Sequence, residues 1–507
     1  MFELLASTEL GWSAGLTGVG AVVLHDGLVA VTTHFPHLYW AGRAHYDGHR
    51  LRHRVVVFDR ATRARIAVFD GARYPIHDLA FRGDGGALAI ACGSYDGGYA
   101  FEGELLVWEL ATNAIRRPLG SNREVVRVRW IDGSRLAVLV RPENDVDSED
   151  AFSQVHGAEL ADVDVPLHRG REPRLSVQPS APEAFGFADS APPSDAAWAV
   201  AGGLTNGIRR AAIRDIAHVD GRIAAVSDDC LVCLWDVALR QVNRITGEGS
   251  GTQILHVAGR VVIAAVENHG SVLHVLDGDA LRMLRRFDRA YLFSADAHGR
   301  LLARDSGRET PRLDLVLDAA GTTLQTADLG HFDVFNHSLR LDGRECLHFL
   351  RGTPASQHTN KILAAITIDG DVHEQMRWDG EGAHRMDPSA CLVDDGALVM
   401  GYKVHNYNPD KATRFIARRD RHGAVEWQVQ WPCAPVALAH APAVGAVLVV
   451  SLDGTLAALD ARTGARRGET QLVLGGMLAP PTCIAVHEAR ATIGTLDGRL
   501  VTVSLTD

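Results

Sequence analysis

One pattern of apolar and polar positions recurs along the chain. A short apolar run ends in an acidic residue, a polar turn follows, and a second run begins. Clear copies are VVVFD ending at Asp59, LVCLWD at Asp236 and LAALD at Asp460. The runs are rich in Val, Ile, Leu and Ala without strict alternation, which is typical of strands buried on both faces. The acidic residue can accept hydrogen bonds from amides of the turn that follows it. The pattern predicts an all-β protein.

The spacing of the copies indicates the architecture. They end at Asp59, Glu109, Asp164, Asp236, Asp277, Asp318, Asp369, Asp420, Asp460 and, in the final copy, Leu505. Most intervals are about 40 to 50 residues, and four short strands in such a period are the signature of a β-propeller. We expect four-stranded antiparallel blades in about ten repeat units, which form one large ring or two smaller rings over residues 1–507.

The two ends of the chain fit the same pattern. The last unit supplies three strands, CIAVHE, ATIGTLDG and RLVTVSL, and the segment FELLASTEL near the N-terminus could supply the fourth. We therefore expect the N- and C-terminal strands to pair, which removes an open sheet edge.

The longest interval, between Asp164 and Asp236, is rich in proline. It contains Pro166, Pro173, Pro179, Pro182, Pro192 and Pro193. Proline lacks the amide donor that a central strand needs. Residues 166–210 are therefore predicted to be an insertion or strap within the repeats.

Two segments resemble known propeller repeats. VCLWD, preceded by AAVSDD, resembles a blade of the WD-repeat proteins, and VLVVSLDGTLAALDARTGARR resembles a quinoprotein-type (PQQ-like) blade. The resemblance covers nearly the whole chain and implies the propeller fold. It implies no single function, because propellers carry many activities.

Composition narrows the possible partners and the compartment. The net charge of −11 argues against nucleic acid or an anionic membrane as partner. No stretch approaches 18 apolar residues, and the first ten residues do not resemble a signal peptide. Seven cysteines at irregular spacing fit a reducing compartment, and basic charge carried almost entirely by arginine fits a GC-rich bacterial genome. We expect a cytoplasmic bacterial protein.

Five units are lengthened between their second and third strands. These insertions are residues 33–52, 93–104, 141–160, 351–361 and 402–413, and they should all open on one face. They hold 10 of the 32 Phe, Trp and Tyr residues of the chain. Exposed loops do not need such side chains for packing, whereas protein-binding surfaces use aromatic and arginine anchors. The alternative is that the insertions pack on one another as a cap.

The predicted binding residues come from three of these insertions. They are Phe35, His37, Tyr39, Trp40, Arg43, Tyr46, Arg50, Tyr95, Tyr99, Phe101, Tyr402, His405 and Tyr407.

Three groups of possible metal ligands favour other interpretations. The histidines of residues 34–53 flank Asp47-Gly48, a hairpin turn that leaves only His49 and His53 on a shared face. Cys230 and Cys233 are three residues apart within a strand and so lie on opposite faces, which favours core packing. The acidic run ENDVDSED at residues 143–150 lacks the glycine of a calcium loop and is predicted to be solvated. We predict no metal and no cofactor.

Familiar catalytic motifs are absent, including G-x-S-x-G, G-x-x-x-x-G-K and H-E-x-x-H. The sequence therefore favours a non-catalytic scaffold that binds a protein partner through the face with the insertions. The alternative is a hydrolase- or lyase-like propeller enzyme with an axial site under those loops. Its first candidates would be His37, Tyr39, Arg43, Asp96 and His405. Charged side chains that converge in a pocket would favour the enzyme, whereas a broad aromatic surface would favour the scaffold.

Overall fold

The chain was analysed as a computed structural model. It describes residues 1–8, 19–33, 52–95, 100–119, 123–145, 151–161, 163, 176, 179–187, 199, 211–227, 230–247, 249–267, 270–306, 312–330, 341, 345–352, 360–379, 384–404, 413–433 and 435–506. In these residues the chain forms antiparallel sheets whose strands follow one another in chain order. Eight sheets have four strands and two have three, and a two-stranded hairpin accompanies them. This is the predicted all-β propeller fold, with ten sheets for the ten repeats.

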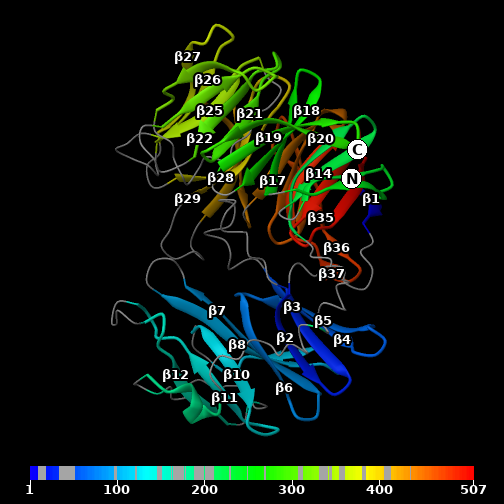
Figure 1. Cartoon of the computed structure of the whole chain (residues 1–507), viewed down its shortest axis with the longest axis vertical. Helices are drawn as coiled ribbons and strands as arrows, with labels where there is room; N and C mark the ends of the chain where they lie inside the picture. The colour runs from blue at the N-terminus through cyan, green and yellow to red at the C-terminus, as the bar shows by residue number, and fades with distance from the viewer. Residues whose placement is uncertain are drawn as a thin grey trace. The chain divides into compact units, whose positions relative to one another are not determined.

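The sheets divide between two compact units of the chain (Figure 1). Unit 2 contains three of them. The first consists of β2 (Val19–His25), β3 (Leu28–Thr33), β4 (His53–Asp59) and β5 (Arg65–Ala72). The second consists of β6 (Ile76–Phe81), β7 (Ala87–Tyr95), β8 (Phe101–Glu109) and β9 (Ala114–Arg116). The third consists of β10 (Val125–Trp130), β11 (Leu136–Val140) and β12 (His156–Leu160). In the Pro-rich segment after β12, the short 3-10 helix η3 (Pro182–Phe185) is described.

Unit 1 contains the other seven sheets. The first three sheets consist of β13 (Ile213–Val219), β14 (Arg222–Ser227), β15 (Cys230–Trp235) and β16 (Gln241–Ile245); of β17 (Ser250–Val257), β18 (Arg260–Glu267), β19 (Gly270–Asp277) and β20 (Ala280–Phe287); and of β21 (Tyr291–Ala295), β22 (Leu301–Asp305), β23 (Asp314–Leu317) and β24 (Thr323–Ala327). The next three consist of β25 (Leu347–Gly352), β26 (Asn360–Ile366) and β27 (Val372–Asp379); of β28 (His384–Leu392), β29 (Leu398–Val404), β30 (Thr413–Arg419) and β31 (Val425–Trp431); and of β32 (Pro435–Ala441), β33 (Ala446–Ser451), β34 (Thr455–Asp460) and β35 (Arg466–Gln471). The seventh consists of β38 (Pro481–His487), β39 (Arg490–Thr495) and β40 (Leu500–Leu505), to which β1 (Phe2–Ser7) is added. The hairpin is β36 (Val473–Leu474) with β37 (Met477–Leu478), and η5 (Pro442–Val444) precedes β33.

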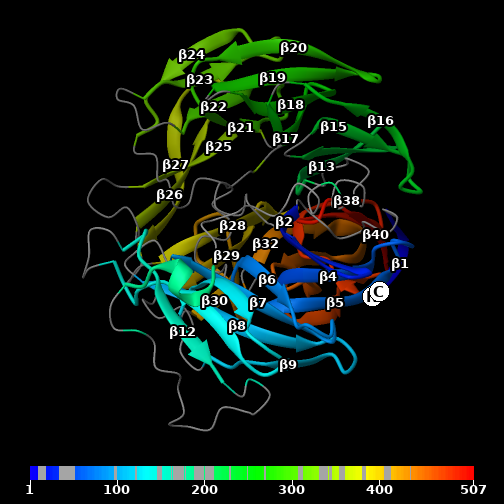
Figure 2. The same cartoon turned by 60° about the horizontal axis from the view of Figure 1, so that its bottom comes forward.

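The seven sheets of unit 1 pack face to face in a closed cycle. Apolar clusters join β13–β16 to β17–β20, that sheet to β21–β24, and so on to the sheet β28–β31 (Figure 2). A further cluster joins β28–β31 to β32–β35, and β32 packs on β38. The cycle returns to its start because β38 also packs on β13, with Cys483 and Leu500 against Ile213 and Ile223. In unit 2, two clusters join its three sheets in series.

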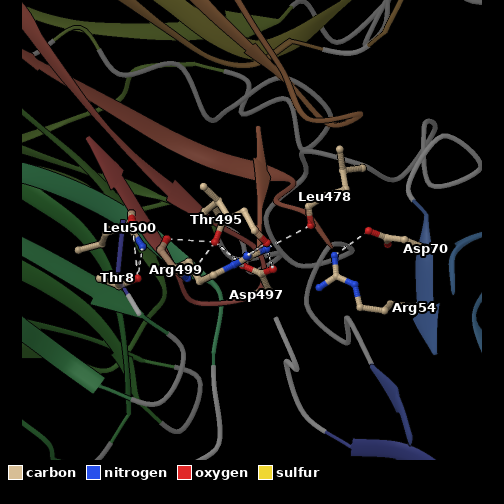
Figure 3. A network of polar contacts seen from close by, with 9 residues as sticks. Thr8, Arg54, Asp70, Leu478, Thr495, Asp497, Arg499 and Leu500 are labelled. Carbon is tan, nitrogen blue, oxygen red and sulfur yellow. Dashed lines mark hydrogen bonds and ion pairs between the residues drawn. The ribbon is translucent and has the colours of Figure 1, made fainter. Parts of the chain in front are cut away.

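The expected pairing of the first and last strands is present. Phe2 lies opposite Leu505 and Ser7 opposite Val501 in the β1–β40 ladder. Thr8 extends it, since its amide donates to the Leu500 carbonyl at 2.9 Å and its hydroxyl accepts from the Leu500 amide at 2.9 Å (Figure 3). The strands of unit 2, β2 to β12, follow β1 in the sequence and precede β13, which lies in the adjacent sheet of unit 1. Unit 2 is therefore inserted at the point where the seven-sheet cycle closes.

The burial of the strands explains their composition. The second and third strands of a sheet are buried along their length, as in β33 and β34, whereas the fourth strand, β35, alternates between exposed and partly buried positions. The acidic residue after the third strand accepts turn amides as predicted. The Asp236 carboxylate accepts from Ala238 and Arg240, both at 2.9 Å, and that of Asp460 from Thr463 at 2.8 Å.

First strands also carry polar links to the next sheet. A register shift near their start places Asp78, Asp215 and Gln253 at equivalent positions in β6, β13 and β17. Asp78 accepts from the Val128 amide of β10 at 3.0 Å, Asp215 from the Ile254 amide of β17 at 2.7 Å, and Gln253 from the Phe293 amide of β21 at 3.0 Å. Burial raises the pKa of Asp78, and the hydrogen bond from Val128 opposes this. The bulge thus lets one side chain satisfy an amide of the neighbouring sheet.

Two fully buried arginines, one in each unit, are paired with carboxylates (Figure 3). In unit 1, Arg499 is 2% exposed, pairs with Asp497, and donates to the carbonyls of Leu474 at 3.0 Å and Leu478 at 3.2 Å. This network fixes the hairpin β36–β37 against the last sheet. In unit 2, Arg54 is fully buried and donates to Asp70 at 2.9 Å across the β4–β5 ladder.

We predict that the seven sheets of unit 1 fold without the three sheets of unit 2. Replacing residues 10–209 by a short Gly/Ser linker retains the β1–β40 ladder and the contact of β13 with β38. A short linker is adequate because β16 and β17 are joined through residues 246–249 alone. The shortened chain should be soluble, give a β-sheet circular dichroism spectrum and unfold cooperatively. An aggregated or non-cooperatively melting product would show that the seven sheets are not self-sufficient.

Two histidines stack where the cycle closes. His218 of β13 and His487 of β38 have ring centroids 5.2 Å apart and planes inclined at 22°. Burial, together with the smaller effect of the charge on His487, lowers the pKa of His218 to about 4. The other charged residues of the turns that follow these strands are Asp220, Arg222, Glu488 and Arg490. The neutral form of His218 is thus the one that fits the folded state.

This arrangement predicts a loss of stability in acid. Between pH 6.5 and about 4 the unfolded chain binds more protons at His218 than the folded chain, so stability falls as the pH is lowered through that window. Discounted for partial exposure, the loss should be about 1–2 kcal/mol. Thermal unfolding of the parent and His218→Phe, which keeps the stacked ring but cannot titrate, measures it. Parallel pH profiles for the two proteins would contradict the assignment.

Candidate functional site

Most of the predicted binding residues lie outside the described part of the chain. This applies to Phe35, His37, Tyr39, Trp40, Arg43, Tyr46, Arg50, Tyr99, His405 and Tyr407, and also to Asp96. Tyr402 lies in β29, where its backbone pairs with Phe415 of β30. The structure describes the side chains of Tyr95 and Phe101, both in unit 2, and brings them together.

Tyr95 and Phe101 form an aromatic cluster with Phe152. The ring centroids of Tyr95 and Phe101 are 5.2 Å apart, and the ring of Phe152 packs edge-on against both, at 4.9 Å from Tyr95 and 5.1 Å from Phe101. Such tilted and edge-to-face pairs are favourable arrangements of aromatic rings. Phe152 belongs to the insertion at residues 141–160. It was not among the predicted binding residues, because one Phe within an acidic segment gives little signal in the sequence.

Two glycines allow the strands to carry the cluster beyond the body of the sheet. The β7–β8 ladder continues through Gly93 opposite Gly103 to Tyr95 opposite Phe101. A Cβ atom on Gly103 would lie 2.2 Å from the Cys92 carbonyl oxygen and 2.7 Å from the Cα atom of Glu124. Only glycine permits this close approach of the next sheet's entering segment.

The insertion at residues 141–160 is attached to that extended hairpin. Ala100 and Asn144 form an isolated β-bridge, and the Phe101 amide donates to the Glu143 carbonyl at 3.2 Å. The Tyr95 hydroxyl donates to Asp145 Oδ2 at 2.5 Å. Two of the five predicted insertions therefore contact each other, as the cap hypothesis expects.

Arginines fix the base of the same insertion. Arg123 donates from Nη2 to the Arg141 carbonyl at 2.6 Å, and Arg141 donates from Nη1 to the Gln154 carbonyl at 3.2 Å. Burial lowers the pKa of Arg123, and the charge of Glu143 opposes this shift. Gln154, two residues after Phe152, is thereby tied to the base of the insertion.

The cluster is buried at one end and open at the other. Phe101 is 2% exposed, whereas Phe152 is 54% exposed. Ala151, the residue before Phe152, is fully buried. A rotation of the turn that buried Phe152 would therefore expose Ala151. We call this region the insertion end of unit 2, comprising residues 73–75, 95, 100–101, 123–124, 141–145 and 151–155. In antiparallel blades, loops between second and third strands share an end with the connections between sheets.

Charged side chains below the cluster form separate pairs. Glu104, 7% exposed, accepts from the Arg73 amide at 2.7 Å and from Arg117 Nε at 3.3 Å. His77 Nε2 lies 2.9 Å from Glu124 Oε1.

Among the described residues, no three or more His, Cys, Asp or Glu side chains are grouped to hold a metal ion. Cys230 and Cys233 are both buried in β15, and the Cys230 thiol donates to the Val232 carbonyl at 3.1 Å.

The comparisons with known proteins identify no family for this chain. No family model matches the chain, and no curated protein matches it in sequence. Among solved structures it is similar to virginiamycin B lyase from Staphylococcus aureus, at 12% identity and a TM-score of 0.45 over 58% of this chain and 96% of that one. It is also similar to Chaetomium thermophilum Raptor, at 10% identity and a TM-score of 0.42 over 59% of this chain and 28% of that one. Function must therefore be argued from this chain's own residues.

The part of the chain that the structure describes contains no helix with the length and apolar character of a membrane span.

The two phenylalanines of the cluster should differ in their effect on stability. Phe101→Ala removes a buried ring and should cost about 3–4 kcal/mol. Phe152→Ala removes an exposed ring and should cost under about 1 kcal/mol. Thermal unfolding of both variants beside the parent tests this difference. Equal losses would mean that Phe152 is part of a cap and not of a surface.

Proposed function

We propose that this protein is a non-catalytic binding module, and that a protein partner docks on the insertion end of unit 2. The observation that carries the proposal is the aromatic cluster, in which an exposed Phe152 is held by two further rings. Large apolar side chains that stay exposed while fixed in place are characteristic of interface anchors. The remaining predicted binding residues belong to this proposal as sequence-based candidates.

The rigidity of the site supports this role. The ring of Phe152 packs on the rings of Tyr95 and Phe101, and hydrogen bonds of Arg123 and Arg141 hold the base of its insertion. A side chain that is already ordered loses little entropy when a partner covers it. Truncating such an anchor typically costs about 2 kcal/mol or more, which is roughly thirtyfold in affinity.

The alternative is an enzyme of hydrolase or lyase type. The ion pair of His77 with Glu124 is the described feature that favours it, because a carboxylate can orient an imidazole for proton transfer. The binding module is preferred because four charged residues at this end, Glu104, Arg117, Arg123 and Arg141, are engaged in holding the backbone or one another.

Photo-crosslinking tests the proposed surface. The photoreactive residue p-benzoylphenylalanine is placed at Phe152 or, as control, at Ile66 of β5. Ile66 is 50% exposed in the same unit, but follows a turn at the opposite end of its sheet. In extracts of the source cell, the residue at position 152 should crosslink a discrete protein that the control does not. Phe152→Ala should then weaken binding of that protein roughly thirtyfold without a matching loss of stability.

The result that would refute the proposal is also specific. If crosslinks form equally from both positions, or not at all from position 152, the insertion end of unit 2 is not a docking surface.

A further inference from the structure

The third sheet of unit 2 is completed by a segment that is not a regular strand. In the described residues β10–β12 form three strands, whereas the other two sheets of unit 2 have four. The place beside β12 is taken by Ser176 and residues 179–187, which we call the edge segment. The Ser176 amide donates to the Gly157 carbonyl at 3.3 Å, and the Ser180 amide to the Val155 carbonyl at 2.7 Å. The Gly157 amide donates in return to the Ser180 hydroxyl at 3.1 Å, so the edge segment binds β12 as an added strand does.

Two aromatic rings of the edge segment cover one face of the same sheet. Ala137 and Leu139 of β11 face away from the sheet β6–β9, and Phe185 and Phe187 pack on them. Phe187 is 3% exposed. Gly157 makes room for the other ring, because a Cβ atom there would lie 2.0 Å from Cε2 of Phe185. Elsewhere in unit 2, apolar contacts of this kind join one sheet to the next.

Two arginines of β10 complete the contacts with these rings. The guanidinium carbon atoms of Arg127 and Arg129 lie 5.3 Å and 5.9 Å from the centroid of the Phe187 ring. Arg129 also donates from Nη2 to the Phe185 carbonyl at 2.7 Å. Gly186, between the two rings, has a φ of +72°, and a Cβ atom there would lie 2.6 Å from Arg129 Nη2. The site therefore fits two aromatic residues separated by one glycine.

The edge segment is attached to its sheet differently from a regular fourth strand. Residues 60–64 alone join β4 to β5, whereas the longer stretch 161–175 separates β12 from Ser176. A longer connection lowers the effective concentration of a tethered segment at its site. Pro179 and Pro182 have no amide with which to extend the pairing to β12. A separate chain with the same chemistry can therefore compete for this site.

We propose that the edge of β12 and the adjacent face of β11 form a binding site for an extended peptide with two aromatic residues separated by glycine. The edge segment occupies this site as an internal ligand, and a protein partner that presents such a peptide displaces it. Recognition combines strand addition with contacts for two side chains. The site adds a second surface to the one proposed above and does not depend on it.

Binding of a peptide to the full-length chain tests the proposal. The double variant Phe185→Ala/Phe187→Ala removes both rings of the edge segment and leaves β11 and β12 unchanged. The probe is a fluorescein-labelled peptide with the sequence of residues 176–187, followed by fluorescence anisotropy. It should bind the double variant, and the parent at least about tenfold more weakly, because the parent contains the competing segment. The unlabelled peptide should also raise the melting temperature of the double variant, since a ligand of the folded state stabilises it.

Altered peptides and a matched variant separate a specific site from general adhesion to a destabilised protein. Peptides with alanine in place of both phenylalanines, or valine in place of the glycine, should not bind the double variant measurably. The control variant is Phe81→Ala, which removes a ring of 9% exposure between the first two sheets of unit 2. It should lose stability without gaining affinity for the peptide.

The parent chain supplies a second measurement, which does not depend on the folding of the double variant. Excess unlabelled peptide should speed hydrogen exchange in fragments of the parent that contain the edge segment and extend beyond residue 187. Exchange in β11 should stay slow. Unchanged exchange in the edge segment would mean that it is a fixed part of the sheet, and the inference would fail.

Other outcomes would also overturn the inference. These are no binding to a folded double variant, equal binding to Phe81→Ala, or equal binding of the alanine peptide. A dimer of the parent that the double variant does not form, seen by sedimentation, would make the edge segment of a second copy the occupant instead. If position 152 crosslinks a partner but the peptide neither binds nor displaces, the proposed function stands and this inference fails. If the peptide binds and position 152 crosslinks nothing, the inference stands alone.

Discussion

The central strands of every sheet are apolar on both faces, and the rest of the structure depends on covering them. A single sheet of this kind would leave both apolar faces in water, at a cost of about 25 cal/mol for each Å² of apolar surface. Within unit 1 each sheet covers the next, and the contact of β13 with β38 covers the last exposed face. This contact closes the cycle of seven sheets. The pairing of β1 with β40 adds the fourth strand to the last sheet.

Polar groups are placed where this packing would otherwise leave them unsatisfied. The side chains of Asp78, Asp215 and Gln253 each bond to an amide of the next sheet, and Arg499 and Arg54 are buried with carboxylate partners. An unpaired charge at such a position costs several kcal/mol, so these pairs fix the geometry of their surroundings more than they add stability. His218 is the contrasting case, because it is accommodated by remaining neutral.

The insertion end of unit 2 is built on the same framework. Glycine at positions 93 and 103 lets β7 and β8 run past the body of their sheet, and the neighbouring insertion attaches to them. The result is at once a cap, at Phe101, and a surface, at Phe152. From the sequence, a cap and a binding surface are alternatives. In the structure the two are compatible, because a cap can hold an exposed side chain in place.

The sequence by itself determined the strands, the ten repeats, the turns after residues such as Asp236 and the pairing of the chain's first and last strands, because apolar patterning and turn chemistry are local signals. It also named Tyr95 and Phe101, which the structure brings together. It did not identify Phe152, nor the insertion of unit 2 between β1 and β13. Those depend on which sheet packs against which, and on which side chain stays exposed after packing. Only the tertiary structure decides these, because burial is set by contacts between residues far apart in the chain.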